Sequence, residues 1–116
     1  MDIETPAALI DEARMDGNIA RMQGHLTALG VRLRPHVKTS KSIDVLQILS
    51  GGREIGITVS TLAEARNFFE RGGPDILHAA GFAPVKLPHV SDVIRTGCIL
   101  RVILERVVSA GAVPGL

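Results

Sequence analysis

The feature that most constrains the fold of this sequence is the regular return of short apolar stretches along the chain. Such stretches are centred near residues 9, 34, 58, 78 and 102. Their spacing of roughly 20 to 25 residues is the length of a strand, a returning helix and two short loops. Repeated βα units build a parallel sheet, so the sequence predicts an α/β fold of about five parallel strands alternating with helices. The last two strands are expected over residues 75–81 and 98–104, and the pattern is lost over residues 105–116.

Polar caps and glycines are predicted to set the ends of the helices. Asp11, then Ser40 or Ser42, and then Thr61 precede amphipathic stretches, where a side-chain oxygen accepts a hydrogen bond from a free backbone N–H. Thr61 is followed three residues later by Glu64, so we expect a capping box and interpret Glu64 as a cap rather than a catalytic acid. The glycines that follow each stretch are expected to end the helices.

The segment Arg34–Lys41 ends one predicted strand and opens a helix. Because α/β folds keep their chemistry at the carboxyl ends of parallel strands, Lys38 is a candidate functional residue. Alternation along the strand places Arg34, His36 and Lys38 on one polar face. A lysine in a dry pocket has a lowered pKa and forms Schiff bases readily. The alternative interpretation is a solvated basic segment before a helix, which spacing alone favours.

Four segments carry a resemblance to a known family. They are T-P-A-A-L-I-D at residues 5–11, N-I-A-R-M at 18–22, R-P-H-V-K-T at 34–39 and I-T-V-S-T at 57–61, the last followed by Glu64-Ala65. Together they resemble the opening part of the D-threonine aldolase and D-serine dehydratase family, pyridoxal-phosphate enzymes built on an alanine-racemase-type barrel. The match runs from Thr5 to about Leu104. It implies that Lys38 binds pyridoxal phosphate covalently, while Ser40 stands where the family often has histidine.

Two neighbours of Lys38 are candidate cofactor-binding residues. His36 shares its polar face, and we expect it to orient the cofactor or move a proton, with a hydrogen-bonded pocket histidine as the alternative. Arg34 is expected to balance a carboxylate or to tune the pKa of the lysine, and a structural ion pair is an equal interpretation.

The other histidines are expected to contribute less. His78, near the end of the fourth predicted strand, is a further candidate for the mouth of the barrel, whereas His25 and His89 are expected on the surface. None of the histidines is spaced from another, or from Cys98, as metal ligands are, so no metal site is predicted.

Length limits what such a chain can do. A closed (β/α)₈ barrel typically needs about 250 residues, and this chain has 116. We therefore interpret residues 1–116 as one truncated barrel domain of the alanine racemase N-terminal type, without the late phosphate-binding loops and without the family's carboxy-terminal β domain and its metal ligands. The resemblance implies a D-amino-acid lyase, an aldolase or a dehydratase, with weak cofactor binding and little activity alone. The alternative is a non-enzymatic partial barrel that self-associates or needs a complementary segment, because its open sheet leaves unpaired edges.

Composition narrows the expected partners. The net charge is +1 and the chain has no Trp or Tyr, which argues against a nucleic-acid role for the basic residues around Lys38. We expect a small D-amino acid as ligand, together with another copy or a complementary segment. Cys98 is the single cysteine and is expected to be a buried, inert thiol. The N-terminus has no stretch suited to secretion or membrane spanning, so the expectation is a cytoplasmic protein without membrane contact.

Overall fold

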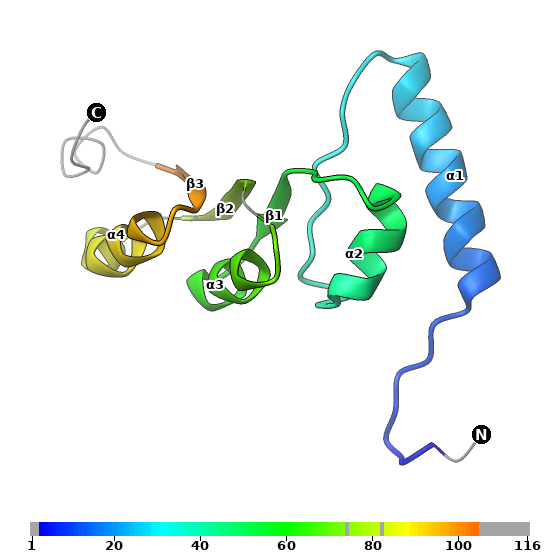
Figure 1. The fold of residues 1–116 in the computed structure, drawn as a ribbon, viewed down its shortest axis with the longest axis horizontal. Helices are drawn as coiled ribbons and strands as arrows, with labels where there is room; N and C mark the ends of the chain where they lie inside the picture. Colours follow the sequence, from blue (N-terminus) through cyan, green and yellow to red (C-terminus); the bar gives the residue numbers. More distant parts are fainter. Residues whose placement is uncertain (1–2, 74, 82, 105–116) are drawn as a thin grey trace. The chain divides into compact units, whose positions relative to one another are not determined.

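The computed structural model describes residues 3–73, 75–81 and 83–104. The chain groups into two compact units, Met1–Leu33 and Arg34–Leu116. In chain order the elements are α1 (Glu12–Ala28), α2 (Ile43–Ser50), β1 (Ile57–Val59), α3 (Leu62–Glu70), β2 (Asp75–Gly81), the 3₁₀ turn η1 (Pro84–Lys86), α4 (Leu87–Arg95) and β3 (Ile99–Ile103) (Figure 1). No helix in the described ranges is both long and apolar enough to cross a membrane. The tail predicted for residues 105–116 lies outside the described residues.

The first unit is organised by α1. Its predicted cap is confirmed, because the Asp11 carboxylate accepts a hydrogen bond from the N–H of Arg14 at 3.0 Å. Gly30 follows the helix with a left-handed φ of 66°, which favours glycine at this position. The strand predicted near residue 9 is not formed, and Leu9 is 77% exposed. A short apolar run is a strand only when a neighbouring strand pairs with it, and the described part of the chain provides no such neighbour.

The second unit is built on a three-stranded parallel sheet in the order β1-β2-β3. The segment before β1 joins this sheet through a single parallel bridge between His36 and Thr58. Two backbone hydrogen bonds hold it there: the Val37 N–H donates to the Thr58 carbonyl at 3.0 Å, and the Thr58 N–H donates to the Pro35 carbonyl at 2.8 Å. The parallel α/β fold predicted from the sequence is therefore confirmed, with three full strands and one bridged edge segment.

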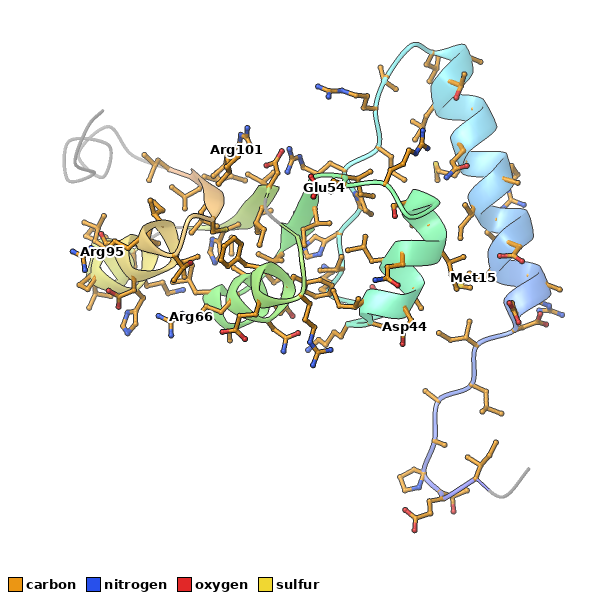
Figure 2. All side chains as sticks on the ribbon, viewed as in Figure 1. Met15, Asp44, Glu54, Arg66, Arg95 and Arg101 are labelled. Atoms are coloured by element: carbon orange, nitrogen blue, oxygen red, sulfur yellow. The ribbon has the colours of Figure 1, made fainter. Side chains whose placement is uncertain are left out.

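The two faces of the sheet have different surroundings. Helices α3 and α4 pack on one face, where the core forms. The buried core side chains are Val37, Ile57, Val59, Ala65, Phe68, Ile76, Val93 and Cys98. On the other face Ile99 is 54% and Ile103 45% exposed, whereas Thr58 of β1 is only 8% exposed, so among the described residues this face is open along β3. Figure 2 shows Arg101 on the open side and Arg66, on α3, on the helix side.

Two predictions about buried residues have different outcomes. Cys98 is buried as predicted, and burial raises the pKa of its thiol. His78 does not face the open side, which corrects the expectation that it lies at the mouth of the barrel. In the sheet it is level with Val59 and Val102, and its ring is fully buried on the helix-covered face. Neither ring nitrogen has a hydrogen-bond partner among the described residues.

The buried imidazole predicts a pH-dependent stability. Burial, helped by the positive charge of Lys86, lowers the pKa of His78 from its ordinary value of 6.5, against the smaller opposing effects of the polar backbone at His78 and Ala80 and of the charge of Glu64. The unfolded chain therefore takes up a proton before the folded chain does. The stability that depends on neutral His78 is fully present above about pH 6.5 and is lost as pH falls through the folded pKa.

We expect the free energy of unfolding, measured by urea titration, to decrease as the pH is lowered from about 7.5 to about 5.5. The slope should be at most about 1.4 kcal/mol per pH unit, the limit for one proton. His78→Leu should remove most of this slope. The matched control His89→Leu, at an exposed position on α4, should keep it. Equal slopes in the wild type and in His78→Leu would contradict the assignment.

Candidate active site at the carboxyl edge of the sheet

Lys38 lies in a turn that continues from the edge segment, at the carboxyl end of the parallel sheet. Val37 anchors the turn, since it is only 3% exposed and belongs to the core. The Lys41 N–H donates to the Val37 carbonyl at 2.9 Å and closes the turn. Lys38 itself is exposed, and in the described ranges its ammonium has no hydrogen-bond or ion-pair partner. The described residues do not enclose Lys38 in a dry pocket, so its surroundings here are those of the solvated segment given as the alternative.

The imidazole of His36 lies between two loops at this edge. Its Nδ1 accepts a hydrogen bond from the backbone N–H of Lys38 at 3.2 Å. Its Nε2 lies 3.3 Å from the Oγ of Ser60, the residue that follows β1. The structure therefore brings together His36 and Lys38, two of the residues predicted for the site, and adds Ser60. The position of Ser60 directly after a predicted strand was the signal in the sequence that could have identified it.

The start of α3 holds the Ser60 loop in place. The predicted capping box is confirmed, because the Thr61 hydroxyl accepts a hydrogen bond from the Glu64 N–H at 3.1 Å. The Glu64 carboxylate in turn accepts one from the Ser60 N–H at 2.9 Å, one residue before the cap. Its second oxygen lies 3.6 Å from the Nζ of Lys41, which is 67% exposed, so this ion pair adds little stability. Glu64 thus serves as a cap that also ties the two loops together.

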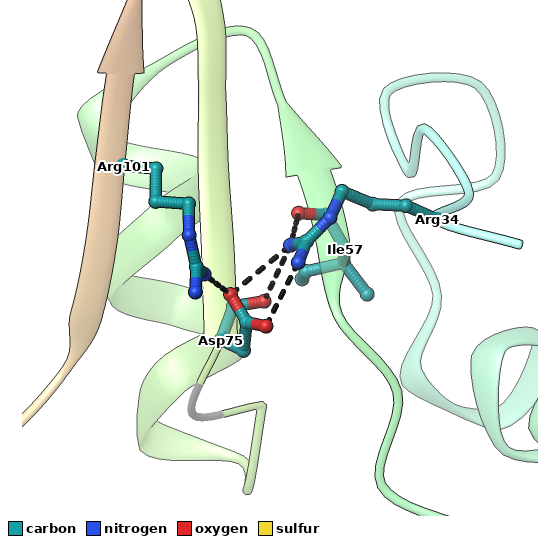
Figure 3. A network of polar contacts seen from close by, with 4 residues as sticks. All are labelled: Arg34, Ile57, Asp75 and Arg101. Atoms are coloured by element: carbon teal, nitrogen blue, oxygen red, sulfur yellow. Dashed lines mark hydrogen bonds and ion pairs between the residues drawn. The ribbon is translucent and has the colours of Figure 1, made fainter. Parts of the chain in front are cut away.

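Arg34 belongs to a different part of the sheet. Its guanidinium makes two hydrogen bonds to the Asp75 carboxylate, at 3.1 and 2.8 Å, and a weaker one to the Ile57 carbonyl at 3.3 Å (Figure 3). Arg101 binds the same carboxylate from β3. Asp75 and Ile57 are the first residues of their strands, so this cluster lies at the amino end of the open face, away from Lys38. The structural ion pair given as the alternative for Arg34 is the arrangement observed.

The electrostatic interactions and the available space both favour the cluster of Arg34, Asp75 and Arg101. Hydrogen bonding by Arg34, followed by the charges of Arg34 and Arg101, holds the pKa of the Asp75 carboxyl below its usual value of 3.8, against the opposing effect of burial. Gly56 leaves room for the guanidinium, since a Cβ at this position would lie 2.5 Å from three of its atoms. Sequence reasoning missed Asp75 and Gly56, because their relation to Arg34 depends on contacts between distant segments.

Other features of the described residues add no ligands to this edge. No group of three or more His, Cys, Asp or Glu residues there is placed to hold a metal ion. A shallow pocket of about 130 Å³ lies between the end of α2 and the turn after α3, and residues such as Leu46, Arg53 and Arg71 line it. These turns lead into the amino ends of β1 and β2, so the pocket is at the end of the sheet opposite Lys38.

Comparison with curated proteins identifies relatives of this chain. No protein-family model matches the chain. It is 50% identical over 113 residues to D-threo-3-hydroxyaspartate dehydratase of Delftia sp. (strain HT23), a match that covers 97% of this chain and 30% of that protein. It is 34% identical over 91 residues to D-serine dehydratase of Dictyostelium discoideum, covering 74% of this chain and 23% of the relative. A 3-hydroxy-D-aspartate aldolase of Paracoccus denitrificans is 29% identical over 108 residues, a match that covers 91% of this chain and 28% of that protein.

Solved structures agree with the sequence matches. D-threo-3-hydroxyaspartate dehydratase from Delftia sp. HT23 superposes with a TM-score of 0.89 at 52% identity, covering 95% of this chain and 29% of that one. An alanine-racemase-like protein from Idiomarina loihiensis gives a TM-score of 0.87 at 37% identity. That match covers 95% of this chain and 30% of the other protein. The fold is therefore that of the alanine-racemase-like α/β proteins.

Within that class, the chain is related to the N-terminal part of the D-amino-acid dehydratases and aldolases, the family that includes D-serine dehydratase. This relationship confirms the resemblance found in the sequence. The chain spans less than a third of the length of the relatives that it matches.

The Arg34 cluster predicts a measurable stability effect. Asp75→Asn would leave two guanidiniums side by side without their shared anion, and we expect the free energy of unfolding to fall by about 1 to 2 kcal/mol in urea titrations. Arg101→Ala is the matched control, because Arg101 is 53% exposed and its removal leaves the Arg34–Asp75 pair intact. If Asp75→Asn were no less stable than Arg101→Ala, the Arg34–Asp75 pair would not be the stabilising element.

Proposed function

We propose that this chain is the lysine-bearing, N-terminal part of a pyridoxal-phosphate-dependent lyase that acts on D-amino acids with a β-hydroxyl group. One observation carries the proposal. Lys38 presents an amine without a partner among the described residues at the carboxyl edge of a parallel sheet, in a chain 50% identical to D-threo-3-hydroxyaspartate dehydratase over 97% of its length. The same edge is where α/β folds carry their active sites.

The described residues suit the aldehyde group of the cofactor better than its phosphate group. The primary amine of Lys38 is exposed, on a turn anchored by buried Val37, and is therefore accessible to an aldehyde. A phosphate, in contrast, needs free backbone N–H groups or basic side chains. The N–H groups of Ser60 and Glu64, at the start of α3, are already bonded to side-chain oxygens of the chain itself. We therefore expect weak cofactor binding and little turnover by this chain alone.

Lys38 has a defined role in the proposed reaction, whereas Arg34 has none. When bound, pyridoxal phosphate supplies an electron sink for the electron pair left at the Cα of the amino acid. Lys38 would hold the cofactor through its side-chain amine. Arg34 is left out of the site, because its guanidinium is already bound to Asp75 at the other end of the sheet. We place dehydration ahead of aldol cleavage, since the relative at 50% identity is named as a dehydratase.

The proposal is tested by labelling the chain with pyridoxal phosphate, reducing with borohydride and mapping the adduct by peptide mass spectrometry. We expect one phosphopyridoxyl group on Lys38, with Lys41 and Lys86 unmodified. Lys38→Ala should lose the adduct, and the matched control Lys41→Ala should retain it. Equal labelling of Lys38→Ala and the wild type, or labelling scattered over several lysines, would overturn the proposal.

A second candidate function is self-association through the open face of the sheet. The observation that favours it is the exposure of Ile99 and Ile103, 54% and 45%, on the uncovered side of the edge strand β3. Exposed apolar side chains on an unpaired edge promote pairing with another copy.

Light scattering at increasing concentration should then show a dimer or a larger species. Ile99→Lys should shift the chain toward the monomer, whereas Ile94→Lys, at a 48% exposed position on α4, should not. A monomer at every concentration would rule out self-association.

A further inference from the structure

A short chain of hydrogen bonds runs from the backbone of Lys38 to the side chain of Ser60. The Lys38 N–H donates to Nδ1 of His36 at 3.2 Å, and Nε2 of the same ring lies 3.3 Å from the Ser60 Oγ. The two ends are fixed independently. Val37, which is buried in the core, anchors the turn that carries Lys38, and the Glu64 carboxylate accepts a hydrogen bond from the Ser60 N–H at 2.9 Å. The imidazole therefore bridges two anchored loops.

The direction of these bonds follows from the first of them. A ring nitrogen that accepts a hydrogen bond carries no proton, so Nδ1 of His36 is unprotonated. The proton of the neutral ring is then on Nε2, and Nε2–H donates to the Ser60 Oγ. The opposite tautomer, and the doubly protonated ring, would place two hydrogens between Nδ1 and the Lys38 nitrogen. The contact of the Lys38 N–H thus selects one tautomer of His36.

The selected tautomer leaves one donor unused. With Nε2–H occupying a lone pair of the Ser60 oxygen, the hydroxyl hydrogen of Ser60 is free to donate elsewhere. In the described ranges the Ser60 hydroxyl has no other hydrogen-bond partner. A donor of this kind, on a loop that the His36 ring ties to the turn of Lys38, suits an anionic oxygen of a ligand bound to that lysine.

From this geometry we infer that His36 is a positioning residue that holds the Lys38 backbone, and that it directs the Ser60 hydroxyl to bind an anionic oxygen of the carbonyl ligand. The Ser60 role rests on the proposed function, since it needs a ligand on Lys38. The His36 role concerns the chain by itself. Both roles go beyond the covalent attachment at Lys38, and they assign to Ser60 a ligand contact.

The His36 role is tested first without any ligand, by NMR of the ¹⁵N-labelled chain. We expect the ring nitrogen shifts of His36 to report a proton on Nε2 and none on Nδ1, and the Lys38 amide to be protected from hydrogen exchange. His36→Asn retains an acceptor at the place of Nδ1, whereas His36→Gln places its amide near Nε2 and loses that acceptor. Lys38 amide exchange should therefore be unchanged in His36→Asn and about fivefold faster in His36→Gln, the effect of losing one neutral hydrogen bond.

A proton on Nδ1, or equal exchange in the two variants, would overturn the positioning role. If His36 were needed only for folding, the two variants would not differ in Lys38 amide exchange. The unfolding midpoints of both variants should match that of the wild type. This result stands whether or not Lys38 binds a cofactor, so it is distinguishable from failure of the proposed function.

The Ser60 role is tested by the rate of reductive labelling at Lys38 with three aldehydes. Pyridoxal phosphate carries a ring hydroxyl and a phosphate, pyridoxal carries the ring hydroxyl without the phosphate, and pyridine-4-carboxaldehyde carries neither. Ser60→Ala should slow labelling by pyridoxal phosphate about tenfold, as expected for a hydrogen bond to a charged group, and should leave pyridine-4-carboxaldehyde unaffected. Slower labelling by pyridoxal as well would identify the ring oxygen as the acceptor, and an effect with pyridoxal phosphate alone would identify the phosphate.

Equal slowing with all three aldehydes, or no slowing with any, would overturn the ligand contact of Ser60. Absence of labelling at Lys38 in the wild type would overturn it together with the proposed function, while the NMR result would still decide the role of His36.

Discussion

The candidate site depends on the two backbone hydrogen bonds that tie residues 35–37 to Thr58. They set the edge segment in parallel register with β1, and Val37 reaches the core from that segment. Because the register is parallel, the start of the segment lies with the starts of the strands and its end lies with their ends. One stretch of chain therefore supplies Arg34 to an ion pair at the amino end and Lys38 to the carboxyl edge.

Features with local causes were predicted well from the sequence. The range of β2, Asp75–Gly81, matches the predicted strand, and the caps at Asp11 and Thr61 form as expected. Each follows from residues within a few positions of one another, so nearby physical chemistry determines it. Family resemblance singled out Lys38 as the candidate site lysine, which spacing alone would have left as one basic residue among several.

Features that depend on distant partners were not predicted. His78 was expected at the mouth, but whether its ring is exposed depends on strand register and on the helices that pack over β2. The ion-pair partner of Arg34 is Asp75, 41 residues further along the chain. The strand expected near residue 9 had the right composition, but the residues that the structure describes offer it no pairing partner. In each case the deciding interaction was absent from the local pattern.

The close fit of the Arg34 guanidinium over Gly56 has a consequence for sequence variation. A side chain at position 56 and an arginine at position 34 compete for the same volume, so the two positions are expected to vary together among homologous chains. A homologue with a larger residue at 56 would retain a smaller one at 34 and would give up the bond to Asp75. In an aligned sequence, the residues at positions 34 and 56 therefore indicate whether the amino end of the open face carries this ion cluster.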